Sequence, residues 1–506
     1  MAHIRQLATA AGLVLLLELV VVWLGPGNVQ AQEQRGWSPV YQLSSPVAAA
    51  SEGFMAADPF GNVHVFWTEK DPVTEGSLIM QARFDGEKWS NPMDIYTTVP
   101  GESINFVSPF VDQNGVIHLV WSEGSNTYYS RALASATISA QSWKRPLLLY
   151  TSSQWVRLQV DSSGVLHVVY SIFYGQNPGV YYVRSEDGGA NWTRPFWLDP
   201  NIPYGQKPNW LQFGLDDMNG LHVVWNYVNP LDQVGQAVLY VQSLDGGATW
   251  SAPLTLDEPD ESGTNLRMAH PGMIINGQNL YVIWGSAKPD SSSNDSIYRK
   301  FQISFDAGRT WSSPQFMLGD LVGQAAGAGF AVDALGRIHY ALQVRYPMAI
   351  WHTYWDSSHW STPTMAYLIA NNSTEEKVVN ETKSRIMAHN VRLAMRNGNQ
   401  LVMTFTNSPG EGPLVLYTTH HTLEDVAPLA PLPTPVPTLT STPVPSPSPT
   451  PSLTPEPVPT RVILNGSSTI DVGRGLTPGG TVGLSLLPGL ILVGAVAFVY
   501  RFGRRL

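Results

Sequence analysis

The stretch DQNGVIHLVW, residues 112–121, joins a tight turn to a strand of alternating side chains that carries a histidine and ends on an aromatic residue. Aspartate and glycine favour the turn, because the carboxylate accepts local N–H groups and glycine tolerates a left-handed backbone. Similar stretches, the last two of them weaker, begin at Asp58, Asp161, Asp217, Asp333, Asn276 and Asn397. Recurrence at this spacing indicates a repeat protein.

Two further marks recur in a fixed order. One is a β-rich stretch with tyrosine, near Tyr181, Tyr240 and Tyr417. The other is Trp-x-x-Pro, at intervals of 49 to 61 residues, which occurs at Trp89, Trp143, Trp192, Trp250, Trp311 and Trp360. Each unit therefore contains four short antiparallel strands, which is typical of a β-propeller blade. The 3.6-residue period of a helical solenoid is absent from the sequence.

The two kinds of mark differ in number. Seven turns occur, but only six Trp-x-x-Pro marks follow the first turn, and one more mark, Trp-Ser-Pro, stands before it at Trp37. The last repeat lacks a tryptophan of its own. We therefore expect an all-β propeller of seven four-stranded antiparallel blades over residues 36–425, with residues 37–43 as the outer strand of the last blade. Such closure removes free sheet edges.

Three repeats carry a tighter motif before the tryptophan, namely SEDGGANW, SLDGGATW and SFDAGRTW. This motif resembles the Asp box, or BNR repeat, of sialidases and related propellers. The resemblance implies a sialidase-like fold and a structural role for the box, whose carboxylate accepts turn N–H groups while the tryptophan packs across the hairpin. The box residues are Ser185, Asp187, Gly189, Trp192, Ser243, Asp245, Gly247, Trp250, Ser304, Asp306, Gly308 and Trp311.

The resemblance also sets an expectation for activity. Sialidases use three arginines, a tyrosine nucleophile with a glutamate base, and an aspartate acid, on the face opposite the boxes. The early Phe-Arg-Ile-Pro segment of the family is missing here, since residues 40–54 read VYQLSSPVAAASEGF, and the catalytic family has six blades. These departures predict a non-catalytic member that binds a glycan or a protein ligand. The alternatives are an exo-sialidase or other glycoside hydrolase, and an extracytoplasmic assembly or scaffold factor.

The face opposite the boxes is built from the loops after the second strands and from the connections between blades. Arg267, Arg345 and Arg385 are candidates for a carboxylate clamp, because guanidinium groups bind carboxylates in a bidentate manner. Trp155, Trp210, Tyr174 and Tyr204 suit either sugar stacking or core packing. The predicted ligand-binding residues are Glu69, Glu123, Arg157, Tyr174, Arg267, Arg345 and Arg385.

Composition excludes several classes of function. A net charge of −10 argues against a nucleic-acid-binding surface, and the absence of cysteine excludes disulfides and thiolate metal sites. No metal and no cofactor are predicted, because the repeated histidines occupy one register of different blades, whereas metal ligands must converge. These histidines are His64, His118, His167, His222 and His339.

The two ends of the chain predict export and anchoring. Residues 1–31 are typical of a secretory signal peptide, with an uncleaved anchor as the alternative. Residues 427–460 are rich in Pro, Thr and Ser, which favours an extended polyproline stalk. A short polar juxtamembrane segment, residues 461–481, follows.

Residues 482–500 are apolar and long enough for a transmembrane helix, and residues 501–506 form a basic tail. A buried core helix is the alternative for the apolar segment. We expect a single-pass protein of the cell membrane, with the propeller outside and the tail in the cytoplasm. The oligomeric state is left open.

Overall fold

The computed structural model describes residues 36–434, except for residues 72, 138, 152, 174–176, 204, 230–234, 259–267, 288–296, 320, 322–328, 345–347, 371–388 and 409–411. Among these residues, no helix combines the length and the apolar character needed to cross a bilayer. The predicted signal peptide, most of the stalk, the juxtamembrane segment, the transmembrane helix and the tail lie outside the described residues.

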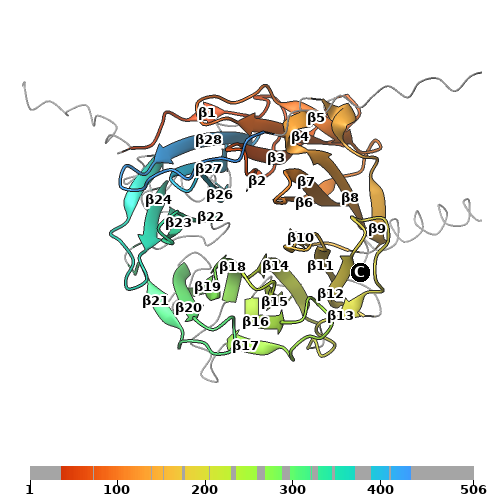
Figure 1. Cartoon of the computed structure of the whole chain (residues 1–506), viewed down its shortest axis with the longest axis vertical. Helices are drawn as coiled ribbons and strands as arrows, with labels where there is room; N and C mark the ends of the chain where they lie inside the picture. Colours follow the sequence, from red (N-terminus) through yellow and green to blue (C-terminus); the bar gives the residue numbers. More distant parts are fainter. Residues whose placement is uncertain are drawn as a thin grey trace, which may run out of the picture. The chain divides into compact units, whose positions relative to one another are not determined.

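Seven four-stranded antiparallel sheets, the blades, surround a central axis (Figure 1). Blade 1 contains β2 (Phe54–Ala57), β3 (Val63–Lys70), β4 (Ser77–Phe84) and β5 (Met93–Thr97). Blade 2 contains β6 (Ile104–Val111), β7 (Val116–Glu123), β8 (Asn126–Leu133) and β9 (Leu147–Thr151), with the short 3-10 helices η1 (Ala134–Ala136) and η2 (Ala140–Ser142) before β9. Blade 3 contains β10 (Val156–Val160), β11 (Leu166–Ile172), β12 (Gly179–Ser185) and β13 (Phe196–Trp197).

The remaining blades repeat this order. Blade 4 contains β14 (Lys207–Leu215), β15 (Leu221–Val228), β16 (Gly235–Ser243) and β17 (Leu254–Asp257). Blade 5 contains β18 (Met268–Asn276), β19 (Asn279–Ala287), β20 (Ile297–Ser304) and β21 (Gln315–Met317). Blade 6 contains β22 (Gly329–Val332), β23 (Ile338–Val344), β24 (Met348–Trp355) and β25 (Thr364–Ala370). Blade 7 contains β26 (His389–Arg396), β27 (Gln400–Asn407), β28 (Val415–Thr422) and β1 (Tyr41–Gln42).

The first strand of each blade lies nearest the axis, and neighbouring first strands contact one another around the ring (Figure 1). Two faces follow from the antiparallel order. The turn face carries the hairpin turns between the first and second strands and, in blades 3 to 5, the Asp boxes between the third and fourth strands. The loop face carries the loops between the second and third strands and the connections between blades.

The ring closes as the sequence predicted. The N-terminal strand β1 pairs with β28 in an antiparallel register, with Tyr41 opposite Thr418 and Gln42 opposite Tyr417. Trp37 forms an isolated bridge with His421, and the Leu43 amide donates to the Leu416 carbonyl at 2.9 Å. The outer strand of the last blade therefore comes from the opposite end of the propeller sequence.

The core is centred on the second strands, which are covered on both faces by the adjacent blades. Strands β11, β15 and β23 are buried along their whole length, which explains why they read as nearly continuous apolar runs. Four tryptophans at one register of different blades are completely buried, namely Trp67, Trp121, Trp225 and Trp284. Burial of such large rings dominates the energy of a fold that has no disulfides.

The repeated histidines form hydrogen bonds inside five of the blades, namely blades 1 to 4 and 6. His222 bonds through Nε2 to Asp216 of the preceding turn, at 3.2 Å, and through Nδ1 to the hydroxyl of Tyr240 on the third strand, at 2.7 Å. Blades 2 and 3 repeat the Asp–His–Tyr relay with His118 and His167. Each histidine is held within its own blade. We attribute to them the structural role that the sequence predicted.

The Asp boxes close the outer hairpins and contact the preceding blade. In blade 4, Ser243 donates to Asp245 and accepts from the Gly247 amide, both at 2.8 Å, and Asp245 accepts from the Thr249 amide at 2.9 Å. The tryptophan of the box packs edge-on against a relay tyrosine of the preceding blade, as Trp250 does against Tyr182 with ring centroids 4.9 Å apart. The boxes thus join neighbouring blades, which agrees with the structural role expected for them.

The first residues of the proline-rich segment lie on the turn face. The amide of Leu429 donates to the carbonyl of Asn397 at 2.7 Å, in the turn of blade 7. The amide of Leu432 donates to the carbonyl of Pro59 at 2.8 Å, in the turn of blade 1. This exit segment, residues 427–434, therefore crosses the junction between the last and the first blade.

Candidate functional site

A cavity of about 170 Å³ lies on the axis of the propeller. It receives residues from all seven blades, because the first strand of each blade borders the central channel. Its lining includes Phe54, Arg157, Trp210, His270, Phe330 and Arg392. Arg157 is near the start of β10, so the cavity extends towards the loop face.

Bulges in the first strands shape this cavity. The ladder between the first and second strands shifts register at Ile104/Phe106 in β6, Asn209/Gln212 in β14, Ala269/Gly272 in β18 and His389/Arg392 in β26. Trp210 and His270 lie within two of these bulges and have positive φ angles of 48° and 54°. Such backbone conformations are costly for residues with a side chain and cluster at functional sites.

Arg157 is the most deeply buried cation of the cavity. Its side chain contacts the rings of Phe54 and Trp155, each with the guanidinium carbon 5.6 Å from the ring centroid. Nη1 donates to the carbonyl of Val156 at 2.9 Å. Within the described part of the chain, Arg157 forms no ion pair. Burial, followed by the charge of Arg392, lowers the pKa of Arg157 to about 10, while Glu52 acts in the opposite direction.

Arg392 faces Arg157 across the ring of Phe54. Its guanidinium carbon lies 5.2 Å from the Phe54 centroid, and Nη2 forms an ion pair with the buried carboxylate of Glu52. Glu52 thus lies between two guanidinium groups and pairs with one of them. Among the described groups at the cavity, Arg157 and Arg392 are positive and Glu52 is negative.

An aromatic wall borders the two arginines. The ring of Trp155 stacks on Phe106, with centroids 3.7 Å apart. It also contacts the ring of Trp210, with centroids 4.9 Å apart. His270 contacts the Trp210 ring edge-on, with centroids 4.2 Å apart. The cavity therefore combines guanidinium groups with aromatic surface, an arrangement that suits a ligand with both a carboxylate and an apolar ring face.

The predicted ligand residues occupy different places. Arg157 lines the central cavity, with Trp155 behind it and Trp210 in the wall. Glu69 accepts from Trp67 Nε1 at 2.8 Å and from the Ser45 amide at 3.0 Å. Glu123 accepts from the Tyr96 hydroxyl at 2.6 Å. These two carboxylates are buried and hydrogen-bonded at the ends of second strands, away from the axis. The other candidates, Tyr174, Tyr204, Arg267, Arg345 and Arg385, lie outside the described residues.

Sequence reasoning did not single out Arg392, Glu52 or His270. The residue four positions before the start of the hairpin turn lines the cavity in six of the blades, and in blade 6 Phe330 lines it instead. This register becomes visible only in the structure, where the turns of blades 4 and 7 start at Asp216 and Arg396, one residue before the starts recognised in the sequence. Arg157 precedes Asp161 by four positions, and Arg392 precedes Arg396 by four. The same offset gives Phe54, Ser108, Gln212 and Gly272, all of which line the cavity.

No protein-family model matches the sequence, and no curated protein matches it. Among solved structures, polysaccharide lyase Uly1 is similar at 8% identity and a TM-score of 0.51, over 77% of this chain and 100% of the lyase. The fold is that of a seven-bladed β-propeller. A Fusarium graminearum α-L-arabinofuranosidase has 10% identity and a TM-score of 0.43, over 64% of this chain and 94% of its own. Trypanosoma rangeli sialidase has 10% identity and a TM-score of 0.40, over 74% of this chain and 55% of the sialidase. These likenesses concern the fold alone.

Proposed function

We propose that this propeller binds a carbohydrate ligand through the central cavity, and that the ligand carries a carboxylate. The observation that carries the proposal is the environment of Arg157. Its guanidinium group is buried at the cavity and has no ion-pair partner among the described residues. A buried charge is costly unless an opposite charge accompanies it, so an anionic ligand would stabilise this group.

The size of the cavity limits how a glycan enters it. Sites that enclose a drug-sized ligand measure about 300–1,000 Å³, whereas this cavity measures about 170 Å³. A single terminal sugar therefore inserts its carboxylate, and the rest of the glycan stays outside. The aromatic wall would contact the apolar face of the sugar ring. A carbohydrate ligand also agrees with the activity named for the similar polysaccharide lyase.

Calorimetric titration with sialyllactose, and with lactose as the neutral control, tests the proposal. We expect sialyllactose to bind and lactose to bind at least tenfold more weakly. Arg157→Gln should reduce the affinity for sialyllactose by roughly 10- to 100-fold, since a charged hydrogen bond contributes about 1.5–3 kcal/mol. Arg194→Gln, at an exposed arginine of blade 3, is the matched control and should bind like the parent.

Equal affinity for the two sugars, or full affinity in the Arg157→Gln variant, would contradict the proposal. The same protein is incubated with a fluorogenic sialoside between pH 4 and 8, where we expect no turnover. Robust turnover would replace the binding function by exo-sialidase activity. Absence of binding to an array of acidic and neutral glycans would favour a protein ligand and a scaffold role.

We also propose that the propeller is displayed at the cell surface. The signal-peptide pattern of residues 1–31 and the apolar residues 482–500 with their basic tail support this location. The proline-rich segment between the propeller and residue 461 would act as a spacer. A polyproline chain extends about 3.1 Å per residue, so such a spacer spans on the order of 100 Å.

A further inference from the structure

The junction that closes the ring, between blades 6 and 7, differs in one respect from the four junctions between blades 2 and 6. At four successive junctions, a tryptophan of one blade packs on a tyrosine or phenylalanine of the preceding blade. The pairs are Tyr129–Trp192, Tyr182–Trp250, Tyr240–Trp311 and Phe301–Trp360. Between blades 6 and 7, Trp37 takes the place of the tryptophan and His352 the place of the aromatic residue, with centroids 5.8 Å apart. The closing tryptophan therefore packs on a titratable ring.

A second imidazole completes this contact. Trp37 stacks on His421 of β28 with centroids 5.4 Å apart and an interplanar angle of 29°. Nδ1 of His421 lies 2.6 Å from the carbonyl oxygen of Gly36. Trp37 is thus held between rings of blades 6 and 7. The strand that follows it in the closing segment, residues 36–43, is only two residues long, and the amides of Ser38 and Leu43 donate to the carbonyls of His420 and Leu416 on either side of this strand.

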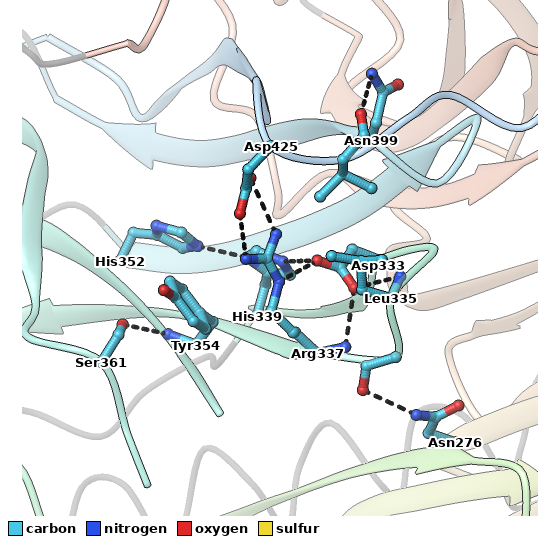
Figure 2. A network of polar contacts seen from close by, with 12 residues as sticks. Asn276, Asp333, Leu335, Arg337, His339, His352, Tyr354, Ser361, Asn399 and Asp425 are labelled. Carbon is cyan, nitrogen blue, oxygen red and sulfur yellow. Dashed lines mark hydrogen bonds and ion pairs between the residues drawn. The ribbon is translucent and has the colours of Figure 1, made fainter. Parts of the chain in front are cut away.

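His352 ends a chain of hydrogen bonds that begins at a carboxylate (Figure 2). Asp333 lies 3.1 Å from His339 Nε2, and His339 Nδ1 lies 2.9 Å from His352 Nε2. A carboxylate only accepts, so His339 donates through Nε2 and accepts at Nδ1 from His352. In blades 2 to 4 a tyrosine hydroxyl makes this last bond. Because Nε2 of His352 donates to His339, a proton that His352 gains enters at Nδ1 and places a cation in the buried contact with Trp37.

The surroundings favour neutral imidazoles. Arg337 forms ion pairs with Asp333 at 2.5 Å and with Asp425 at 2.6 Å (Figure 2), so both carboxylates are already shared with a cation. Burial, followed by the charges of His339, His421 and Arg337, keeps the pKa of His352 well below its usual value. Burial also lowers the pKa of His339, although Asp333 opposes this effect. The charged or titratable groups around His352 are Asp333, Arg337, His339, Tyr354, His421, Glu424 and Asp425.

Space for water exists beside these rings. Blade 7 has no Asp-box hairpin, because its third and fourth strands come from opposite ends of the propeller. A pocket of about 690 Å³ is found there, between blades 6 and 7, and its lining includes Gly36, His339, His352 and His421. Water in this pocket can hydrate an imidazolium once Trp37 moves away.

We propose that the closing segment is an acid-labile latch, in which protonation of His352 releases Trp37 and frees β28 from β1. The direction follows from linkage. In an open latch His352 is hydrated and titrates near its ordinary value of about 6.5. In the closed latch its proton affinity is lower, so the open form binds more protons. The closed form is therefore favoured above about pH 6.5 and loses stability as the pH falls below that value.

Hydrogen exchange of the purified propeller at pH 7 and pH 5 tests the latch, with each rate divided by the intrinsic rate at that pH. The reporters are the amides of Ser38 and Leu43, which donate to His420 and Leu416. Their protection should fall about tenfold or more at pH 5. The Leu198 amide, which joins the outer strand of blade 3 to Val180, is the matched control and should keep its protection.

A variant separates the latch from general acid sensitivity. His352→Tyr restores the tyrosine of blades 2 to 4, which can donate to His339 as Tyr240 does to His222, and the adjacent pocket has room for the larger ring. Ser38 and Leu43 should then be equally protected at both pH values. If the parent protein protects these two amides equally at pH 7 and pH 5, that result alone would overturn the proposal. Parallel loss at Leu198, or an unaltered pH response in a folded His352→Tyr protein, would also overturn it.

Discussion

The hydroxyl group of Tyr240 lies directly beneath Gly308 of the next blade, where any other residue would place its Cβ atom. Gly308 has a φ of +78°, so both its backbone and its surroundings require glycine. The same relation joins Tyr182 to Gly247. The glycine of the Asp box is therefore needed for contact between blades as well as for the turn.

Gly308→Ala should destabilise the propeller by about 2–5 kcal/mol, because overpacking costs about 1–3 kcal/mol and a left-handed backbone about 1–2 kcal/mol. Gly246→Ala is the control. Gly246 has open space around it, and the equivalent position of blade 5 is Ala307, with a φ of +56°. This variant should lose at most about 2 kcal/mol. Urea denaturation compares the two, and equal losses would refute the role given to Tyr240.

Trp37→Ala should cost about 3–5 kcal/mol of stability, which is typical for removing a buried tryptophan. Trp37 is 7% exposed and belongs to the core cluster of blades 6 and 7. Tyr41→Ala, in the same segment at a side chain that is 52% exposed, should change the stability by about 0.5 kcal/mol or less. If both proteins melt like the parent, the closing segment does not stabilise the ring.

Glu52→Gln should destabilise the protein by about 1–3 kcal/mol, because it replaces the buried carboxylate that pairs with the partly buried Arg392 by a neutral amide. An acidic glycan should recover part of the lost melting temperature, since it supplies a new carboxylate. Glu186→Gln breaks an exposed pair with Arg184 and should cost less than about 1 kcal/mol. A Glu52→Gln protein as stable as Glu186→Gln would contradict the account of the cavity charges.

The Asp boxes predict a loss of stability in acid. The side-chain and backbone hydrogen bonds from Thr249 lower the pKa of Asp245 to about 2, and those from Thr310 do the same for Asp306. Their folded-state pKa is below the ordinary value near 3.9. The stability they contribute is thus present above pH 4 and lost as the pH falls towards 2. Melting temperatures from pH 5 to 2 should fall less steeply in Asp306→Asn than in the parent, and parallel curves would count against this effect.

Truncation before Arg461 should release the propeller from membranes, because it removes residues 482–500 and the basic tail. Fractionation of cells that express the full chain and the truncated chain measures this. The full chain should sediment with membranes, and the truncated chain should be soluble. A truncated protein that still sediments would require another attachment.

Sequence periodicity was sufficient for the architecture. The turn and tryptophan marks predicted seven blades, and the position of Trp37 before the first turn predicted the pairing of β1 with β28. Because these marks repeat, each copy strengthens the assignment of the other copies to blades. The histidines repeat at one register of different blades as well, which is why a structural interpretation of His167 or His222 could be made without coordinates.

The central cavity depends on features that do not repeat. A bulge changes which side chain faces the axis, and the positive φ of Trp210 and His270 leaves no mark in the sequence. Arg392 lies within a first strand, whereas the sequence hypothesis placed the ligand site in the loops after second strands and in the connections between blades. That hypothesis included Glu69 and Glu123, but proximity to a loop does not determine where a side chain points. Arg157 was predicted because it closely follows a connection between blades.

The exit segment has a consequence for access to the central cavity. Leu429 and Leu432 bind the chain to the turns of blades 7 and 1, so the path towards residue 482 starts from the turn face. The cavity with Arg157 extends towards the opposite side. The exit segment therefore does not run across the loop face. A ligand that approaches Arg157 from that face would meet no part of residues 427–434.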